Sequence, residues 1–225
     1  MSKFLELKNI SKTFETSKKL KVIKNLSYNF KKGKIYSLMG PSGSGKSTLL
    51  NLISLIDKPS NGLIKFNKHQ INYDDKEQND QLRAKKIGIV YQQNNLLPDF
   101  TSLENIYLAS LSVDNNKNLA ISKAKKLLQK IGLSSRADHY PSQLSGGEAQ
   151  RIAIARAIIN DPEIILADEP TGSLDMKTAK IIFNLLKDQK RSDRLIIFAT
   201  HNRFFGNKAD CLLEILNGKI KSSNG

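Results

Sequence analysis

The chain has 225 residues, enough for one α/β domain with an inserted subdomain to bury a substantial core. Its longest apolar stretches fall far short of the roughly 20 residues of a membrane-spanning helix, and its first residues lack the apolar core of a secretory signal. Cys211 is the only cysteine, so a disulfide framework is excluded and a reducing compartment is expected. The net charge is +15, but the lysines are spread along the chain without interleaved aromatic residues. This argues against nucleic acid, favours a solvated surface and leaves an anionic membrane as the alternative.

The apolar pattern along the chain predicts alternating strands and helices, as in an α/β fold. Alternating apolar positions at 4–10 and 21–30 are typical of a half-solvated antiparallel sheet. Further strands are predicted at 34–39, 63–66, 87–91, 164–167 and 195–199. Helices are predicted at 74–85 and 176–188 and, one after another, between 94 and 141, where the apolar spacing becomes helical. The tail from Lys221 onward is expected to fray.

A glycine-rich turn separates the strand at 34–39 from an apolar helix that begins near Lys46. Strand, turn and helix in this order match a Walker A P-loop, in which backbone N–H groups and the helix dipole converge on phosphate oxygens. Lys46 is expected to reach the β- and γ-phosphates of a nucleotide. The expected nucleotide-binding residues here are Gly40, Pro41, Ser42, Gly43, Ser44, Gly45, Lys46, Ser47 and Thr48.

Two acidic residues follow the apolar strand at 164–167. Ser47 and Asp168 offer a hydroxyl and a carboxylate, so we expect them to hold Mg²⁺ beside the phosphates. Glu169 is the natural general base for the attacking water, and the alternative is a carboxylate that only caps or pairs with a helix. His201 follows the strand at 195–199, at the sheet edge where α/β folds place ligands, and is expected to sense the γ-phosphate.

The segment Leu144-Ser145-Gly146-Gly147-Glu148 precedes a helical stretch, so it predicts a second helix N-terminus with an exposed hydroxyl and backbone donors. An ordinary helix cap at Ser145 is the local alternative. Together with the P-loop and the acidic pair, this segment makes essentially the whole chain resemble the ATP-binding subunits of ABC transporters. The resemblance implies a P-loop NTPase (RecA-like) α/β core with an N-terminal antiparallel β subdomain and an inserted α-helical subdomain. The single domain 1–225 would then consist of a core of about 1–92 and 158–225 and a helical subdomain of about 93–157.

The same resemblance implies an ATPase that uses ATP and Mg²⁺ and works as a homodimer. Ser145, Gly146 and Gly147 of one copy would close on the ATP held by the P-loop of the other copy. Gln92 is implied as a catalytic residue and Mg²⁺ ligand, and Asp175 as a residue at the dimer seam. Phe14 falls where the family stacks an aromatic ring on adenine, with a place in the core as the alternative.

Residues 92–105 and 166–172 resemble the family branch that contains lipoprotein-releasing and macrolide-export ATPases, and 98–101 and 199–202 resemble lipoprotein-releasing subunits most. Many relatives carry aspartate where Asn202 stands, so macrolide or peptide export and a regulatory, non-transport role in cell division stay open. The branch implies transmembrane permease subunits as partners, no nucleic acid partner, and a peripheral location on the cytoplasmic face of the inner membrane. The candidate contacts with a permease are Asn94, Asn95, Leu96, Leu97 and Phe100.

Overall fold

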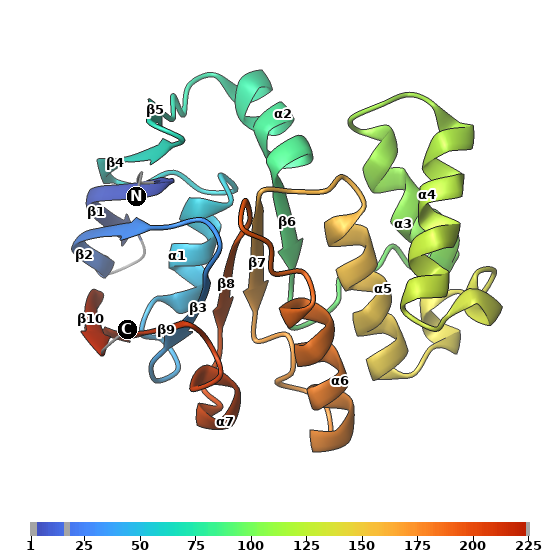
Figure 1. Cartoon of the computed structure of the whole chain (residues 1–225). Coiled ribbons are helices and arrows are strands. Elements are labelled where there is room, and N and C mark those ends of the chain that lie inside the picture. The colour runs from blue at the N-terminus through green and yellow to red at the C-terminus, as the bar shows by residue number, and fades with distance from the viewer. Residues whose placement is uncertain (1–3, 16–18, 224–225) are drawn as a thin grey trace. The chain divides into compact units, whose positions relative to one another are not determined.

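A computed structural model describes residues 4–15 and 19–223 of the chain (Figure 1). The chain divides into two compact units, of which the first comprises residues 1–80 and 190–225 and the second residues 81–189. The boundary between the units falls within the charged helix α2 (Lys76–Lys86). This helix begins two residues later than the helix predicted at 74–85.

The first unit contains the antiparallel sheet predicted from the alternating apolar positions. Its strands lie in the order β2-β1-β4-β5, with β1 at Leu5–Phe14, β2 at Leu20–Phe30, β4 at Asn61–Phe66 and β5 at His69–Gln70. Leu5 and Leu7 are buried on one face of β1, whereas Glu6 between them is partly exposed, as the period of two requires. The short strand β5 was not predicted; it pairs with the end of β4 through Phe66 and His69.

A second sheet of the same unit carries the strand that leads into the P-loop. Strand β3 (Ile35–Met39) lies between β8 (Leu195–Ala199) and β9 (Cys211–Leu216) and is parallel to both. All residues of β3 and β8 are buried, as expected for parallel strands covered on both faces. The helix α1 (Lys46–Ile53) follows β3, and the short helix α7 (Arg203–Gly206) follows β8.

The frayed tail expected from Lys221 is wrong for residues 221–223. Strand β10 (Lys219–Ser223) pairs antiparallel with β9 along its whole length. The hairpin between them turns at Asn217 and Gly218, whose φ angles are 51° and 77°. An Asn-Gly pair with positive φ at both positions matches the twist of the flanking strands, so the turn itself fixes the pairing.

The second unit combines a parallel strand pair with several helices. Strands β6 (Ile87–Val90) and β7 (Ile164–Asp168) pair in parallel register, with Val90 opposite Ala167. The helices are α3 (Ser102–Leu111), α4 (Lys117–Lys130), α5 (Gly146–Ile158) and α6 (Met176–Lys187), with 3₁₀ turns η1 (Ser134–Arg136) and η2 (Pro141–Gln143).

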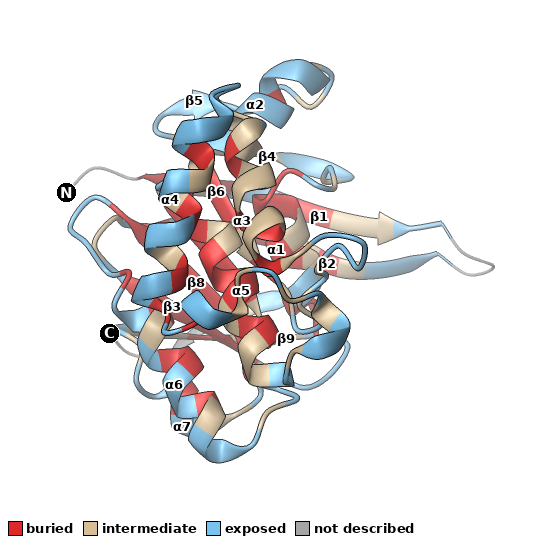
Figure 2. Ribbon diagram, turned by 90° about the vertical axis from the view of Figure 1, so that its right-hand side faces the viewer, coloured by how far each residue is buried: buried red, intermediate tan, exposed pale blue. Residues whose placement is uncertain are grey.

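Helices α3, α4 and α5 share one apolar core within this unit. Ile106 of α3, Leu128 of α4 and Ile152 of α5 are almost completely buried and belong to the same cluster. In Figure 2 the helices of the unit carry both buried and exposed residues, as expected for amphipathic helices packed on one side. This core holds the start of α5 in place, and the predicted site residue Ser145 caps that start.

Candidate functional site

The P-loop has a backbone that only glycine fits at two of its positions. Gly40 and Gly45 have φ angles of 150° and 102°. A Cβ atom at Gly40 would lie 2.4 Å from the carbonyl oxygen of Ile215, and one at Gly45 would lie 2.8 Å from Cδ1 of Ile23. At these two positions the loop packs so closely against its neighbours that a side chain has no room.

Lys46, the first residue of α1, is buried, with 8% of its surface exposed. Its Nζ donates hydrogen bonds to the carbonyl oxygens of Gly40 and Pro41 at 2.8 and 3.0 Å. No side chain caps the N-terminus of α1, and its first turn has no acidic residue. The hydroxyl of Ser44 is buried and has no hydrogen-bond partner. A buried ammonium, an uncapped helix start and an unsatisfied hydroxyl fit an anion with several oxygens, such as a polyphosphate.

His201 lies in the same unit, beyond the carboxyl end of β8. Ala199 pairs with Leu38 of the neighbouring strand β3, and Thr200 N–H donates to the Leu38 carbonyl at 3.0 Å. The exposed His201 therefore follows the strand next to the one that leads into the P-loop. Asn202 accepts a hydrogen bond from Phe204 N–H at 2.9 Å and so caps α7, a role that a neutral side chain fulfils.

Phe14 is the last residue of β1, and 37% of its surface is exposed. Lys12 Nζ lies 5.0 Å from the centre of the ring. The ring is thus not part of the core. A place in the core was the alternative to stacking on adenine.

Asp168, Glu169 and Gln92 come together in the second unit. Asp168 ends β7, and Gln92 lies two residues beyond the end of the parallel strand β6. A methyl group at Gly172 would lie 3.2 Å from Nε2 of Gln92 and 3.5 Å from Cβ of Glu169. The amide of Gln92 therefore approaches the loop that follows β7.

Glu169 has a φ angle of 45°, in the left-handed region that a residue with a side chain seldom adopts. Glu169 and Asp168 are both partly buried. Strain of this kind is concentrated at functional sites, where the surrounding structure holds it in place.

Ser145 is the N-cap of α5 and forms a capping box with Glu148. The Ser145 hydroxyl accepts from Glu148 N–H at 3.3 Å, and the Glu148 carboxylate accepts from Ser145 N–H at 2.8 Å. Arg136 Nε donates to the other Glu148 oxygen at 2.9 Å. The hydrogen bond from Arg136 is the largest of the causes that lower the pKa of Glu148 to about 2. Arg136 thus holds a charged Glu148 that in turn fixes the backbone of Ser145.

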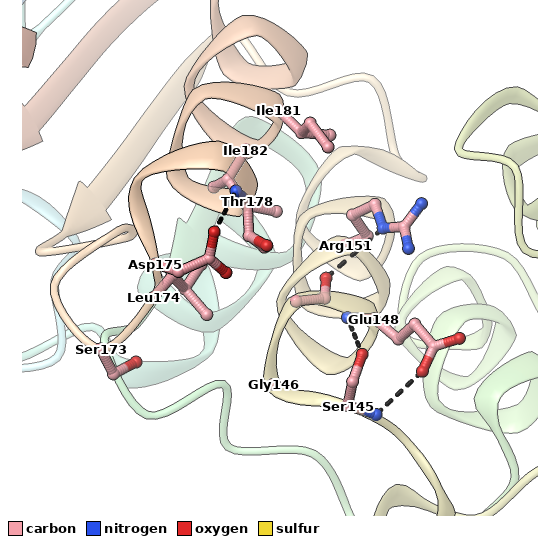
Figure 3. Close-up of a pocket in the computed structure, with 11 residues that line it drawn as sticks. Ser145, Gly146, Glu148, Arg151, Ser173, Leu174, Asp175, Thr178, Ile181 and Ile182 are labelled. Atoms are coloured by element: carbon pink, nitrogen blue, oxygen red, sulfur yellow. Dashed lines mark hydrogen bonds between the residues drawn. The ribbon is translucent and has the colours of Figure 1, made fainter.

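Asp175 caps the neighbouring helix α6 by accepting from the N–H groups of Lys177 and Thr178 at 2.9 and 3.1 Å. Its hydrogen bonds with Thr178 lower the pKa of this carboxyl. Figure 3 shows the starts of α5 and α6 facing each other, with Ser145 and Asp175 on the same hollow, whose volume is about 330 Å³. A Cβ atom at Gly147 would lie 2.4 Å from Cγ2 of Thr178, so the two helices touch here without a side chain between them.

Three contacts that support these residues were missed by sequence reasoning. Gln150 is buried on α5 and donates through Nε2 to the carbonyl of Tyr91 at 3.0 Å, next to Gln92. Arg156 donates to the carbonyls of Asn94 and Asn95 at 2.7 Å each. The third contact is the Arg136–Glu148 ion pair. None has a local sequence signal, because each joins segments brought together only by the fold.

Oxygen donors of the kind that Mg²⁺ prefers are present at the predicted positions: the Ser47 hydroxyl, the Gln92 amide oxygen and the Asp168 carboxylate. Ser47 belongs to the first unit, and Gln92 and Asp168 belong to the second. Within the described residues no three His, Cys, Asp or Glu side chains gather as a metal site of their own. Hydroxyl, amide and carboxylate oxygens are all ligands that Mg²⁺ accepts, so the chemistry of the predicted donors fits this ion.

Comparison with known proteins gives one consistent answer. The ABC transporter family model matches residues 23–172. The chain is 41% identical to the lipoprotein-releasing system ATP-binding protein LolD of Rickettsia bellii, covering 99% of both chains. It is 43% identical to LolD of Wigglesworthia glossinidia brevipalpis, covering 98% of this chain and 97% of that one.

Among solved structures, the chain is similar to the ATP-binding cassette MJ0796 in a dimeric post-hydrolysis state bound to ADP and Pi, with a TM-score of 0.90 and 36% identity. That match covers 99% of this chain and 100% of the other. These similarities confirm the predicted P-loop NTPase fold. No helix in the described ranges has the length and apolar character needed to cross a membrane.

Proposed function

Because the chain belongs to the ABC transporter family and is an ATP-binding ATPase of it, we propose that two copies close around two ATP molecules and drive a separate membrane permease. The transported cargo is lipoprotein, released from the inner membrane, and the chain acts at the cytoplasmic face of that membrane. The ATPase part rests on the P-loop, where the buried Lys46 ammonium and the unsatisfied Ser44 hydroxyl are suited to bind an anion.

The P-loop residues bind and orient the nucleotide. Lys46 exchanges its two carbonyl partners for β- and γ-phosphate oxygens, and the N–H groups from Gly43 to Thr48 donate to the α- and β-phosphates. Ser47, Gln92 and Asp168 would hold Mg²⁺, which would supply positive charge that offsets the phosphate oxygens. Phe14 stacks on the adenine with its exposed ring.

Glu169 acts as the general base. Its carboxylate accepts the proton of the attacking water, while the amide of Gln92, held close to the loop after β7, orients that water. His201 donates a hydrogen bond to the γ-phosphate from the end of β8 and so detects whether that phosphate is present.

Ser145 completes the site of a second copy. Its hydroxyl and the N–H groups of Gly146 and Gly147 form an exposed helix start that suits the γ-phosphate held by the partner's P-loop. Asp175 lies on the same hollow and contacts the partner at the seam. The dimeric state of the similar MJ0796 cassette supports this arrangement. ATP then joins the two copies, and hydrolysis separates them.

The loop that precedes α3 is the contact with the permease. Leu97 and Phe100 are 43% and 39% exposed, and Asn105 fixes the loop by donating to the Leu97 and Phe100 carbonyls at 3.1 and 2.9 Å. A rigid loop that presents two apolar side chains suits a helix of a partner protein. Leu96 does not share this role, because it packs against the core of α3, α4 and α5.

Reconstitution tests the transport part. The chain is purified with the membrane proteins encoded beside it, placed in proteoliposomes that contain a lipoprotein, and supplied with ATP. We expect ATP-dependent release of the lipoprotein to a soluble carrier. Leu97→Asp should lose the membrane partner while still binding ATP, and Ile56→Asp, an equivalent change at an exposed residue outside the loop, should keep it. If the complex hydrolyses ATP and exports another compound without releasing lipoprotein, the proposed cargo is wrong, but the assignment as an ATPase stands.

A further inference from the structure

Helix α4 and the turn after it form a segment without acidic residues. From Asn115 to Ala137 the sequence contains five lysines and one arginine, but no aspartate or glutamate. The five lysines are called the lysine face below: Lys117, Lys123, Lys125, Lys126 and Lys130. None of them belongs to the proposed nucleotide site or to the permease contact.

The lysine face contains no ion pair within the described part of the chain. Its lysines take part in none of the ion pairs found there, whereas Arg136 is paired with Glu148. The flanking Asp114 is engaged by the backbone N–H of Asn116 at 3.2 Å, at the start of the helix. Like charges on one helix repel each other, so an external anion would stabilise α4.

The five lysines are distributed around a helix of which one side is firmly packed. Ala120, Ala124 and Leu128 are buried at successive turns, and Figure 2 shows α4 with one buried and one exposed side. The exposed side also presents Leu119, which is 42% exposed. An apolar side chain beside lysines is typical of helices that lie at a membrane surface.

A hollow of about 630 Å³ borders α4 and includes two of the five lysines in its lining. Asn118, Ser122, Lys125, Lys126 and Gln129 of α4 line it, together with Ser134 of η1, and its apolar lining includes Ile121. Its charged lining groups are all cationic, and its polar lining offers amide N–H and hydroxyl donors. The hollow therefore suits an anion better than a cation.

We infer that the lysine face of α4 binds the anionic phospholipid headgroups of a membrane surface. Nucleic acid is disfavoured because residues 115–137 contain no aromatic side chain on which a base could stack. An acidic peptide is disfavoured because the five cations are lysines on flexible stems, which match a fluid array of phosphates, and because Leu119 has a place in the headgroup layer. The inference goes beyond the proposed function, and it concerns the chain without its permease.

Vesicle sedimentation with the full-length chain tests this inference. The vesicles contain phosphatidylglycerol and phosphatidylcholine in equal amounts, and phosphatidylcholine alone serves as the neutral reference. The test variant is Lys125→Gln/Lys126→Gln, and the matched control is Lys219→Gln/Lys221→Gln on β10. Both variants remove two exposed lysines and reduce the net charge of +15 equally.

We expect the chain to sediment with the anionic vesicles and not with the neutral ones, and added salt to release it. The α4 variant should bind about tenfold to thirtyfold more weakly, given about 1 kcal/mol for each lysine near an anionic surface. The control variant should bind nearly as the unchanged chain does.

Polyglutamate and duplex DNA are tested as alternative anionic ligands. Three results would overturn the inference: no binding to anionic vesicles, an equal loss of vesicle binding in both variants, or an α4 variant that binds vesicles normally and loses binding only to polyglutamate or DNA. ATP turnover is measured on the same samples. Because neither variant touches the nucleotide site, failure of vesicle binding with normal turnover would refute the membrane contact alone. Absent turnover with normal vesicle binding would refute the proposed function alone.

Discussion

Gly147→Ala should destabilise the contact between the starts of α5 and α6. The new Cβ would lie 2.4 Å from Cγ2 of Thr178, where ordinary contacts begin near 3.4 Å, so one helix or the threonine has to move by about 1 Å. Overpacking of this size costs about 1–3 kcal/mol. For a chain of this length, each kcal/mol lowers the melting temperature by about 2–4 °C.

Thermal unfolding of two matched variants isolates that effect. Gly146→Ala adds the same methyl group one residue earlier, where it would meet only Cδ2 of Leu174 at an ordinary 3.6 Å. Both variants gain the same helix propensity, so the difference between them reports the clash. In Gly147→Ala/Thr178→Ser the interfering methyl is gone but the hydroxyl beside Asp175 remains, and stability should return. Equal melting temperatures for the two alanine variants, or no recovery in the double variant, would refute the close contact.

Lys46→Ala should abolish measurable ATP binding because the phosphates lose their buried positive charge; unchanged affinity in a nucleotide titration would contradict the P-loop assignment. Arg136→Gln should lower stability by about 1 kcal/mol at neutral pH. The hydrogen bond from Arg136 is the largest of several causes that lower the pKa of Glu148 from 4.5 to about 2, so the contribution of Arg136 is complete above pH 4.5 and is lost as the pH falls toward 2. Urea midpoints of the two proteins should therefore converge in acid, and a constant difference down to pH 3 would contradict this role.

Local patterns were enough to predict the elements that carry the chemistry. The strand, glycine turn and helix around Lys46 and the strand before Asp168 have short-range signals, and the fold and the ATPase activity are confirmed. The roles of individual residues such as Glu169 and Ser145 remain predictions. Strand β10 was missed although the signal was present, because lysine and serine in the tail outweighed the Asn217-Gly218 turn.

The supporting contacts could not be predicted because their partners lie far apart in the sequence. Gln150 and Tyr91 are 59 residues apart, and their hydrogen bond depends on how α5 packs beside β6. The short distance between Gly147 and Thr178 likewise requires the path of two helices. Such contacts arise from packing within the second unit, which no single segment specifies.

The mass of Glu169→Gln in solution with ATP tests the central claim, that two chains share each nucleotide, most directly. Removing the general base should leave ATP bound and unhydrolysed. Light scattering should then show that the mass rises from the 25.2 kDa of one chain to that of a dimer when ATP is added. Adding Ser145→Arg to the same variant should keep ATP binding but return the mass to that of one chain. An ATP-bound Glu169→Gln that stays at 25.2 kDa, or a dimer indifferent to Ser145→Arg, would contradict the shared site.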